Sequence, residues 1–476
     1  MSQVNLIYNV EDKPGWGKTI VFALQQLLAI LAATIAVPAI INNGVPGAGM
    51  SPAAALFGAG IGTLVYLLFT KFKSPVFLGS SFAFIGSMLA AFAGAVGMSV
   101  GYLGLLIGAA SAGLVYAIIA LVVKFVGTGW INKLMPAVVI GPTVAIIGLS
   151  LAGNAIGDFT TGSFVEGVSE WTKWIGLTCG LVTLLVTIIV SVFGKKFLKM
   201  IPFIIGILSG YALAAGFTGI GFAAGIDELK IINFGKFSNM EWLPSFTFLT
   251  AFSGDYQWGD FGSFGPYLLS ILVAYVPVAF VVFAEHIADH KNLSSIIGRD
   301  LLEEPGLHRT LLGDGIGSFA GAFFGGCPNT TYGESVGTVA ISGNASIRTI
   351  FVTAIMAMVL AFVAPFSTFL STIPSCVMGG VCIALYGFIA VSGLKMIQKT
   401  DLNDNRNLFV VSVILIAGIG GLVITIGKVT ITAIAAALIL GIVVNIITHC
   451  KKEPAPEQQA EKAEEIKEPV AEEKEE

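Results

Sequence analysis

The sequence predicts an all-α polytopic membrane protein with fourteen transmembrane segments in two inverted seven-span repeats. Hydrophobic residues make up 55% of the 476 residues and charged residues only 11%, and the mean hydropathy is +0.88. Soluble proteins carry about 25% charged residues, so this chain could not cover its own surface in water. Long apolar runs and a one-sided distribution of basic residues complete the prediction.

Eleven apolar runs are long enough for a spanning helix, which needs about 20 residues. They lie at 19–41, 52–70, 101–123, 134–156, 174–193, 200–223, 264–286, 349–372, 374–394, 407–427 and 429–448. Three further segments, 76–98, 310–326 and 330–343, are apolar but short or interrupted by glycine. We expect these three to cross as broken helices, which brings the count to fourteen.

Basic residues are distributed as this count requires. With the N-terminus inside, the predicted inner side receives all four arginines and most lysines, and the outer side receives only Lys173, Lys230, Lys236 and Lys428. Cytoplasmic loops carry such an excess of lysine and arginine. The sequence therefore predicts a multi-pass protein of the cytoplasmic membrane with both termini in the cytoplasm.

Two pairs of short segments suggest an internal repeat. Residues 136–141, PAVVIG, resemble residues 374–379, PSCVMG, and each opens an apolar run. Residues 78–82 and 328–332 both place two small polar residues before an aromatic residue, inside broken segments. Inverted repeats with broken helices in matching positions are typical of secondary transporters whose site lies at the membrane midplane.

Several classes of function are excluded or disfavoured. The first 450 residues hold 20 basic and 19 acidic residues without a basic stripe, so nucleic-acid binding is not expected. The five cysteines are scattered and are interpreted as apolar fillers, and neither a metal site nor a cofactor is predicted.

The aromatic loop 224–262 is expected to lie in the outer membrane interface, with a lid over the site as the alternative. Residues 453–476 are almost devoid of apolar side chains and should be disordered.

Ionisable residues within spans are costly and are therefore functional candidates. Glu285, His286, Asp289 and His290 end the eighth predicted span, and Asp314 and Glu334 lie in the ninth and tenth. Glu285 and Asp289 are four residues apart and so share one helix face. The alternative for Asp289 and His290 is that both already lie in cytoplasmic water.

The broken segment before Glu334 has the composition of a ligand site. Pro328 and the preceding glycines permit a break, and the backbone N–H groups freed at the start of a half-helix can donate to acceptor oxygens. Two half-helices with two carboxylates suit a small, planar, neutral molecule with alternating N–H and C=O groups. Phe82 and Tyr332 could cover its ring faces.

These motifs resemble the nucleobase–ascorbate transporter family, and specifically its bacterial uracil:proton symporters. The resemblance covers about residues 15–448 and rests on F283-A-E-H286, G306-L-H-R309, P328-N-T-T-Y-G-E334, Q25-Q-L-L-A29 and G79-S-S-F-A-F84. It implies a core domain of spans 1–4 and 8–11 (residues 19–126 and 264–372) that moves against a gate domain of spans 5–7 and 12–14 (residues 134–223 and 373–449). It also implies short strands in spans 3 and 10. The remaining parts are a cytoplasmic N-terminus (1–18), an extracellular loop (224–263) and an acidic tail (450–476).

The resemblance also implies roles for individual residues. Glu285 and Glu334 would hydrogen-bond a uracil base, Phe82 and Tyr332 would flank it, and the amides of Gly333 and Phe82 would contact it, with Ala33 packed nearby. Glu285, Asp289 and Asp314 would couple transport to a proton. Asp289 stands where uracil members have histidine, and Asp314 stands where they can have asparagine. Acidic residues at these two positions are similar to the xanthine branch.

The prediction is therefore import of uracil with a proton, with xanthine or another oxo-purine as the alternative. An anion transporter of similar architecture would require a basic residue beside the tenth-span break, where Glu334 stands. A membrane-embedded enzyme is disfavoured because the sequence offers no nucleophile–base pair. The expected partners are the base, the proton and the lipid bilayer, and a homodimer is compatible with this interpretation.

Overall fold

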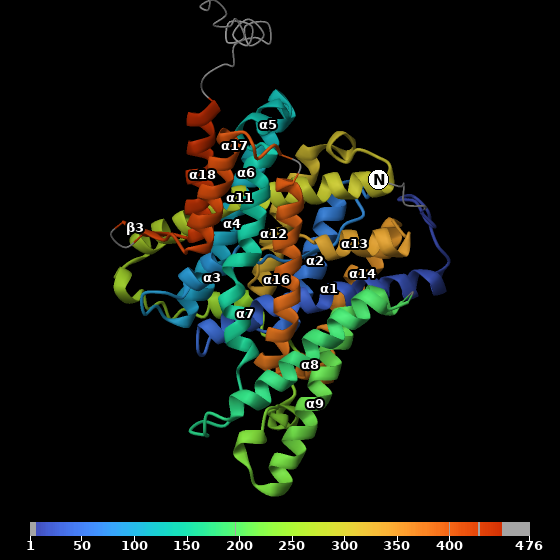
Figure 1. Cartoon of the computed structure of the whole chain (residues 1–476), viewed down its shortest axis with the longest axis vertical. Helices are drawn as coiled ribbons and strands as arrows, with labels where there is room; N and C mark the ends of the chain where they lie inside the picture. The colour runs from blue at the N-terminus through green and yellow to red at the C-terminus, as the bar shows by residue number, and fades with distance from the viewer. Residues whose placement is uncertain (1–5, 196, 399, 427–428, 450–476) are drawn as a thin grey trace, which may run out of the picture.

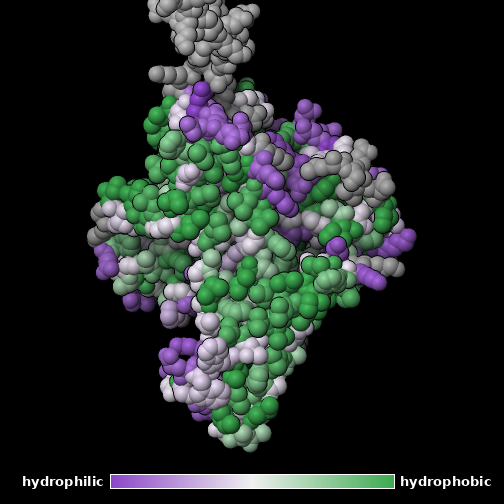
Figure 2. Space-filling model, in the orientation of Figure 1, coloured by the Kyte–Doolittle hydropathy of each residue, from purple (hydrophilic) through white to green (hydrophobic). Residues whose placement is uncertain are grey.

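The computed structural model describes residues 6–195, 197–398, 400–426 and 429–449 and is dominated by helices (Figure 1). Within these residues, eight helices are long and apolar enough to cross a membrane, or nine if one bent pair is counted as a span. Hydrophobic side chains dominate the face shown in Figure 2, including the projecting α8 and α9. The acidic tail 450–476, predicted to be disordered, lies outside the described residues.

One group of helices packs around α2 and α12. Its members are α1 (Trp16–Gly44), α2 (Pro52–Phe69), α3 (Ile85–Ala91), α4 (Met98–Val126), α11 (Phe264–Ile297), α12 (Leu307–Gly325), α13 (Gly333–Ser342) and α14 (Ile347–Leu360). A Cβ added to Gly58 of α2 would lie 2.5 Å from the carbonyl oxygen of Gly321 in α12. Glycine lets these two backbones touch, as small residues do at helix contacts in membranes.

A second group packs around α6 and α16. Its members are α6 (Ala137–Ser150), α7 (Ala152–Phe159), α8 (Thr172–Phe193), α9 (Pro202–Ala224), α16 (Ser375–Ile397), α17 (Asn405–Ile419) and α18 (Ala433–His449). Pro136 and Pro374, which open the two similar segments in the sequence, are the N-cap residues of α6 and α16. These two helices pack against each other, so the sequence similarity corresponds to two neighbouring elements.

Short strands lie in the two broken segments, where the sequence predicted them. Strand β1 (Leu78–Ser80) pairs antiparallel with β2 (Asn329–Thr331), and Gly79 lies opposite Thr330. Each strand is followed by a helix of the first group, β1 by α3 and β2 by α13. Two segments about 250 residues apart in sequence are thereby joined at the start of two half-helices.

Three predicted span boundaries are wrong. The run 349–372 is a helix that ends at Leu360 and a second helix, α15 (Ala364–Thr372), bent from it by 84°. Pro365 stands in the first turn of α15, where proline starts a new helix readily. In the run 407–427, the helix ends at Ile419. Gly421 adopts a left-handed conformation (φ +71°), and the β-branched residues that follow form a hairpin of β3 (Ile424–Ile426) and β4 (Val429–Ile431).

The third boundary matters most for the site. Helix α11 does not end near residue 286 but continues to Ile297, so Glu285, His286, Asp289 and His290 all lie inside it. The remaining elements are short and connect the spans. They are α5 (Gly129–Leu134), α10 (Thr247–Ala251) and five short 3-10 or π-helical segments at Leu198–Met200, Asp227–Leu229, Phe234–Asn239, Gly259–Phe261 and Leu302–Gly306.

Candidate functional site

The strand pair β1–β2 is hydrogen-bonded to Tyr332, the N-cap residue of α13. The Tyr332 N–H donates to the carbonyl of Phe77 (3.2 Å), and the Tyr332 hydroxyl donates to the carbonyl of Ser80 (3.0 Å). A Cβ on Gly79 would lie 2.2 Å from the Tyr332 ring, so only glycine fits beneath it. Glycine inside a strand commonly marks such a close approach.

Helix α13 begins at Gly333, immediately after Tyr332. The backbone N–H groups of a first helical turn have no partner within the helix, and the helix dipole favours acceptors there. Gly333 is exposed and Glu334 is half-buried, whereas Ser335 is buried. The start of α13 therefore presents backbone donors and the Glu334 carboxylate together.

Two carboxylates of α11 face this point. Asp289 Oδ2 accepts a hydrogen bond from the Thr331 hydroxyl (2.8 Å), and its Oδ1 would lie 3.8 Å from a Cβ built on Gly333. Glu285 is half-buried, and its buried Oε2 has no hydrogen-bond partner in the described structure. An unpartnered buried carboxylate oxygen can accept a hydrogen from a ligand. The structure thus brings Asp289 to Thr331 and Gly333. Glu285 interacts electrostatically with both Asp289 and Glu334.

Helix α1 supports the start of α13 from behind. Gln26 donates from Nε2 to the Ser335 hydroxyl (2.5 Å), and that hydroxyl also accepts from the N–H of Phe77 (3.0 Å). Ala33, which was predicted to lie beside the base, is fully buried on the same helix (0% exposed). These contacts join α1, β1 and α13 into one support.

Phe82 precedes α3 and connects the two groups of helices. Its ring meets that of Tyr386 in α16 edge-on, with centroids 5.6 Å apart, and it lines a cavity of about 700 Å³ between α3, α7 and the β3–β4 hairpin. Tyr386 was missed in the sequence because it lies inside an ordinary apolar run. Its hydroxyl is buried.

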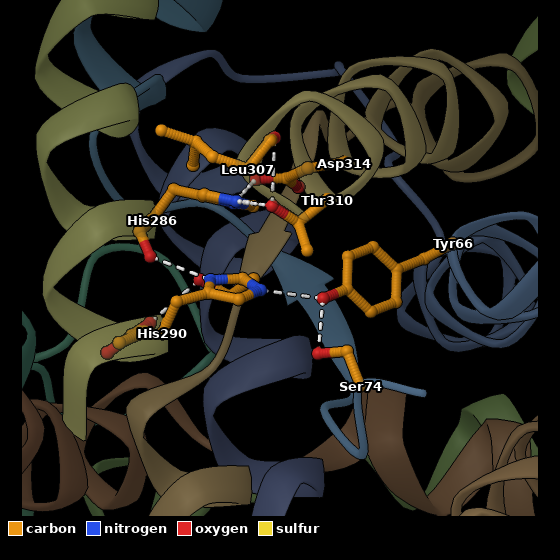
Figure 3. A network of polar contacts seen from close by, with 9 residues as sticks. Tyr66, Ser74, His286, His290, Leu307, Thr310 and Asp314 are labelled. Atoms are coloured by element: carbon orange, nitrogen blue, oxygen red, sulfur yellow. Dashed lines mark hydrogen bonds and ion pairs between the residues drawn. The ribbon is translucent and has the colours of Figure 1, made fainter. Parts of the chain in front are cut away.

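A second face of α11 carries two stacked imidazoles, His286 and His290, whose centroids lie 4.0 Å apart (Figure 3). His286 Nδ1 lies 2.7 Å from Asp314 Oδ2, and its Nε2 lies 3.0 Å from the Thr310 hydroxyl. Asp314, predicted to act with Glu285 and Asp289, therefore contacts the histidine face of α11. A role of Asp314 in proton coupling stays a prediction, and within the described residues its carboxylate contacts His286.

The solvated alternative for His290 is wrong. His290 is 1% exposed, because α11 continues for two turns beyond it. Its Nδ1–H donates to the carbonyl of His286 (2.8 Å), and its Nε2 lies 2.7 Å from the Tyr66 hydroxyl, which in turn lies 2.7 Å from Ser74 Oγ. Asp289 is half-buried and bonded to Thr331, which is also not the environment of a solvated helix end.

The aromatic loop 224–262 borders a larger cavity of about 960 Å³, which lies between α1, the start of α16 and that loop. Lys236 lines it and donates to the carbonyl of Ser371 (2.8 Å), and burial lowers the pKa of this amine. Phe248 stacks on Phe323 of α12 at 5.0 Å, whereas Trp242 is 65% exposed. The loop therefore combines packed and exposed aromatic residues, and both interpretations of it stay open.

Among the described residues, no group of three or more His, Cys, Asp or Glu side chains could hold a metal ion.

Comparison with known proteins shows similarity to permeases over almost the whole chain. The model of a permease family (Xan_ur_permease) matches residues 17–427. The uracil permease of Bacillus subtilis is 38% identical over 463 residues, which are 95% of this chain and 98% of that protein. The uracil permease of Escherichia coli K12 is 38% identical over 92% of this chain and 93% of its own length. A putative pyrimidine permease of the same organism is 30% identical over 94% of this chain and 93% of its own length.

Solved structures share the fold at low sequence identity. The transmembrane domain of the cyanobacterial bicarbonate transporter BicA superposes with a TM-score of 0.59 at 16% identity, covering 93% of this chain and all of that one. The murine anion transporter Slc26a9 in an inward-facing state gives a TM-score of 0.56 at 11% identity, covering 92% of this chain and 69% of that one. At these identities the likeness concerns the fold alone.

Proposed function

Since the chain belongs to the permease family, as a member of the nucleobase–ascorbate transporters, we propose that it imports uracil into the cell together with a proton. The protein is a transporter rather than an enzyme, and its apolar helices make it a multi-pass membrane protein. The observation that carries the proposal is the meeting of Glu285, Asp289 and Glu334 with the open start of α13.

Uracil fits the chemistry of this meeting point. It is planar and neutral, and its two ring N–H groups alternate with two carbonyl groups. Glu285 and Glu334 would accept from the N–H groups, and the first-turn amides of α13 would donate to a carbonyl. Phe82, whose ring meets that of Tyr386 edge-on, would cover one face of the base. Tyr332 is the proposed contact on the other side.

The proposed architecture has fourteen spans in two inverted repeats, with both termini in the cytoplasm. The antiparallel pairing of β1 with β2, and the packing of α6 against α16, support a relation between the two halves. In this proposal the helices packed around α2 and α12 form the core domain, and those packed around α6 and α16 form the gate domain. Movement of one against the other would give alternating access to the site.

Coupling would depend on Glu285 and Asp289. They lie one helical turn apart on the face of α11 that meets the start of α13, and two like charges at such a distance disfavour simultaneous ionisation. We propose that the pair holds one proton when the base is bound and releases it on the cytoplasmic side. Loading of the base and loading of the proton would then accompany each other.

Uptake of radiolabelled uracil into proteoliposomes with an imposed proton gradient tests the proposal. Unlabelled uracil should compete, whereas xanthine and sulfate should not. Glu285→Gln should abolish accumulation, because the base ligand and the proton carrier are lost together. Glu334→Ala should weaken uracil binding by about 1–3 kcal/mol, because a base N–H loses its acceptor in a desolvated site.

Each rival function predicts a different result in the same proteoliposomes when the labelled substrate is changed. Uptake of labelled xanthine without uptake of labelled uracil would favour an oxo-purine carrier, for which the acidic Asp289 and Asp314 are the supporting residues. Uptake of labelled sulfate without uptake of labelled uracil would favour an anion transporter. Full accumulation by Glu285→Gln would contradict the proposed site.

A further inference from the structure

Helix α11 carries two adjacent stripes of polar side chains with different surroundings. Glu285 and Asp289 form the first stripe and are half-buried at the candidate site. His286 and His290 form the second stripe and are 0% and 1% exposed. An offset of one residue rotates a side chain by about 100° around a helix, so the two stripes face different neighbours.

The histidine stripe is bonded to the body of the first group of helices. Figure 3 shows both imidazoles pointing away from the helix axis toward α12 and α2. His286 contacts Asp314 (2.7 Å) and Thr310 (3.0 Å), two residues of α12 one turn apart. Both of its ring nitrogens therefore have partners, although the ring is fully buried.

His290 connects the same helix to α2 and to the segment that leads into β1. Its Nδ1–H is committed to the carbonyl of His286, so Nε2 is the ring atom left to meet the Tyr66 hydroxyl. The Tyr66 hydroxyl also hydrogen-bonds Ser74, which lies four residues before Leu78 of β1. One network therefore reaches α12, α2 and the approach to the strand that pairs with β2.

We propose that His286 and Asp314 are positioning residues, which fix the rotation of α11 and thereby the aim of Glu285 and Asp289. This inference rests on the proposed function of the carboxylate stripe. A buried polar group left without a partner is costly, so α11 is held where both imidazoles are satisfied. A small rotation of the helix would break the contact with Asp314 and move both carboxylates relative to the start of α13.

This role differs from the sequence-based prediction that Asp314 carries the coupling proton. A carrier must lose its function when its carboxyl becomes an amide, whereas a positioning residue needs only the shape and the acceptor. Asp314 Oδ1 has no hydrogen-bond partner in the described structure, so an amide nitrogen in its place would break no existing hydrogen bond. Asparagine at position 314 would keep one oxygen for the His286 N–H.

The experiment compares Asp314→Ala and Asp314→Asn in full-length protein reconstituted in liposomes. Uracil uptake and proton flux are measured together across external pH. Asp314→Ala should raise the KM for uracil about tenfold, because the His286 N–H loses its partner and α11 is no longer held. Asp314→Asn should restore KM to within about threefold of wild type, with unchanged pH profile and proton:uracil ratio. Ser318→Ala, a nearly buried position one turn further along α12, is the matched control and should behave as wild type.

Two results with the Asp314 variants would overturn the inference. Loss of proton flux or of pH dependence in Asp314→Asn, with uracil binding intact, would make Asp314 a proton carrier. An unchanged KM in Asp314→Ala would show that α11 does not depend on this contact. If Asp314→Ala fails to reach the membrane, Thr310→Val tests the other ring nitrogen of His286 without altering a charge. It should raise KM several-fold while leaving the proton:uracil ratio intact, and a wild-type KM would contradict the positioning role.

Discussion

Gly79 is the residue with the least room for a side chain near the candidate site. A Cβ there would lie 2.2 and 2.3 Å from two ring carbons of Tyr332, and backbone hydrogen bonds to Phe77 and Pro328 hold both sides of the contact. Overpacking of a well-packed interior typically costs about 1–3 kcal/mol. We therefore expect Gly79→Ala to displace Tyr332 and the start of α13 and to abolish uracil binding.

Gly86 provides the matched control for that substitution. It lies seven residues later in α3, and a Cβ there would meet Thr432 only at 3.7 Å, an ordinary contact distance. Gly86→Ala should retain binding in an equilibrium assay with labelled uracil. Equal affinities for the two variants would show that the Gly79–Tyr332 contact does not shape the site.

Asp289 is the residue whose substitution should separate binding from coupling. Asparagine can still accept the Thr331 hydrogen bond, so the local geometry should persist, but the position can no longer take up a proton. Asp289→Asn should bind uracil with an affinity near that of wild type while its uptake no longer responds to the pH gradient. Parallel records of proton and uracil flux in liposomes would check this. Wild-type pH dependence and stoichiometry would mean that Asp289 does not share the coupling proton.

Single residues could be predicted from the sequence where their chemistry is unusual for a membrane span. Glu285 and Glu334 stood out because charge is costly there, and the structure places both where α11 meets the start of α13. His290 was misjudged because the end of α11 could not be located from hydrophobicity, which fades before the helix ends. Tyr386 gave no signal, since a tyrosine in an apolar run matters only through its neighbour Phe82, which is distant in sequence.

At the scale of elements, an N-terminal segment, residues 6–14, is bound along the turn between α13 and α14. Backbone hydrogen bonds join Ile7 to Gly343, Ala345 to Tyr8, and Ile347 to Val10, at 2.7, 2.9 and 3.1 Å. The Ser346 hydroxyl and the Arg348 guanidinium bond the carbonyls of Asp12 and Pro14. This segment supports the C-terminal end of the half-helix that carries Glu334.

Removing residues 1–12 should therefore lower the thermal stability of the protein in detergent and weaken uracil binding. Each lost hydrogen bond contributes about 0.5–1.5 kcal/mol, and several are lost together. Deletion of residues 453–476 is the matched control, because an acidic segment poor in apolar residues buries little surface. That truncation should leave transport and melting temperature unchanged. Equal behaviour of the two truncations would contradict a supporting role for residues 6–14.

Glu11 in the same segment should respond to pH in a defined direction. The Arg299 guanidinium hydrogen-bonds Glu11 (2.5 Å) and holds the pKa of that carboxyl below its usual range. A lowered pKa in the folded protein means that the stabilisation is present above the unfolded pKa and is lost as the pH falls through the folded one. Both side chains are well exposed, at 37% and 60%, so Glu11→Gln should cost less than about 1 kcal/mol. Thermal unfolding at neutral and acidic pH would check both the sign and the size.

Elements could be predicted from the sequence where hydrophobic length alone defines them. Helices α1, α4, α8 and α9 lie close to their apolar runs. The run 349–372 instead contains a bend, and the run 407–427 ends in the first strand of a hairpin. A bilayer selects for apolar composition, and a transverse helix or an apolar hairpin satisfies that selection as well as a straight span does. Local signals were present in Pro365 and in Gly420-Gly421, but they are weaker than the hydrophobicity around them.

At the scale of the whole molecule, the two groups of helices are joined at the end of α1. Asn43 Nδ2 donates to Asp158 Oδ1 of α7 (2.8 Å), and the Ser375 hydroxyl at the start of α16 lies 3.4 Å from Asn43 Oδ1. Asn43 and Ser375 also line the cavity of about 960 Å³. In the proposed orientation this junction lies on the outer side, where it would hold core and gate domains together.

The last prediction is that Asn43→Ala weakens this closure. The substitution removes both contacts, and a net loss of about 1 kcal/mol would shift the balance between closed and open outer faces about fivefold. Asn42→Ala is the matched control, because among the described residues the Asn42 side chain bonds only Met50, which precedes α2 (2.7 and 2.9 Å). A cysteine at Ala39, which lines the same cavity, would report the change. A membrane-impermeant thiol reagent should label Ala39→Cys several-fold faster together with Asn43→Ala than alone or with Asn42→Ala. Equal labelling rates in all three proteins would mean that the Asn43–Asp158 contact does not hold the two groups together.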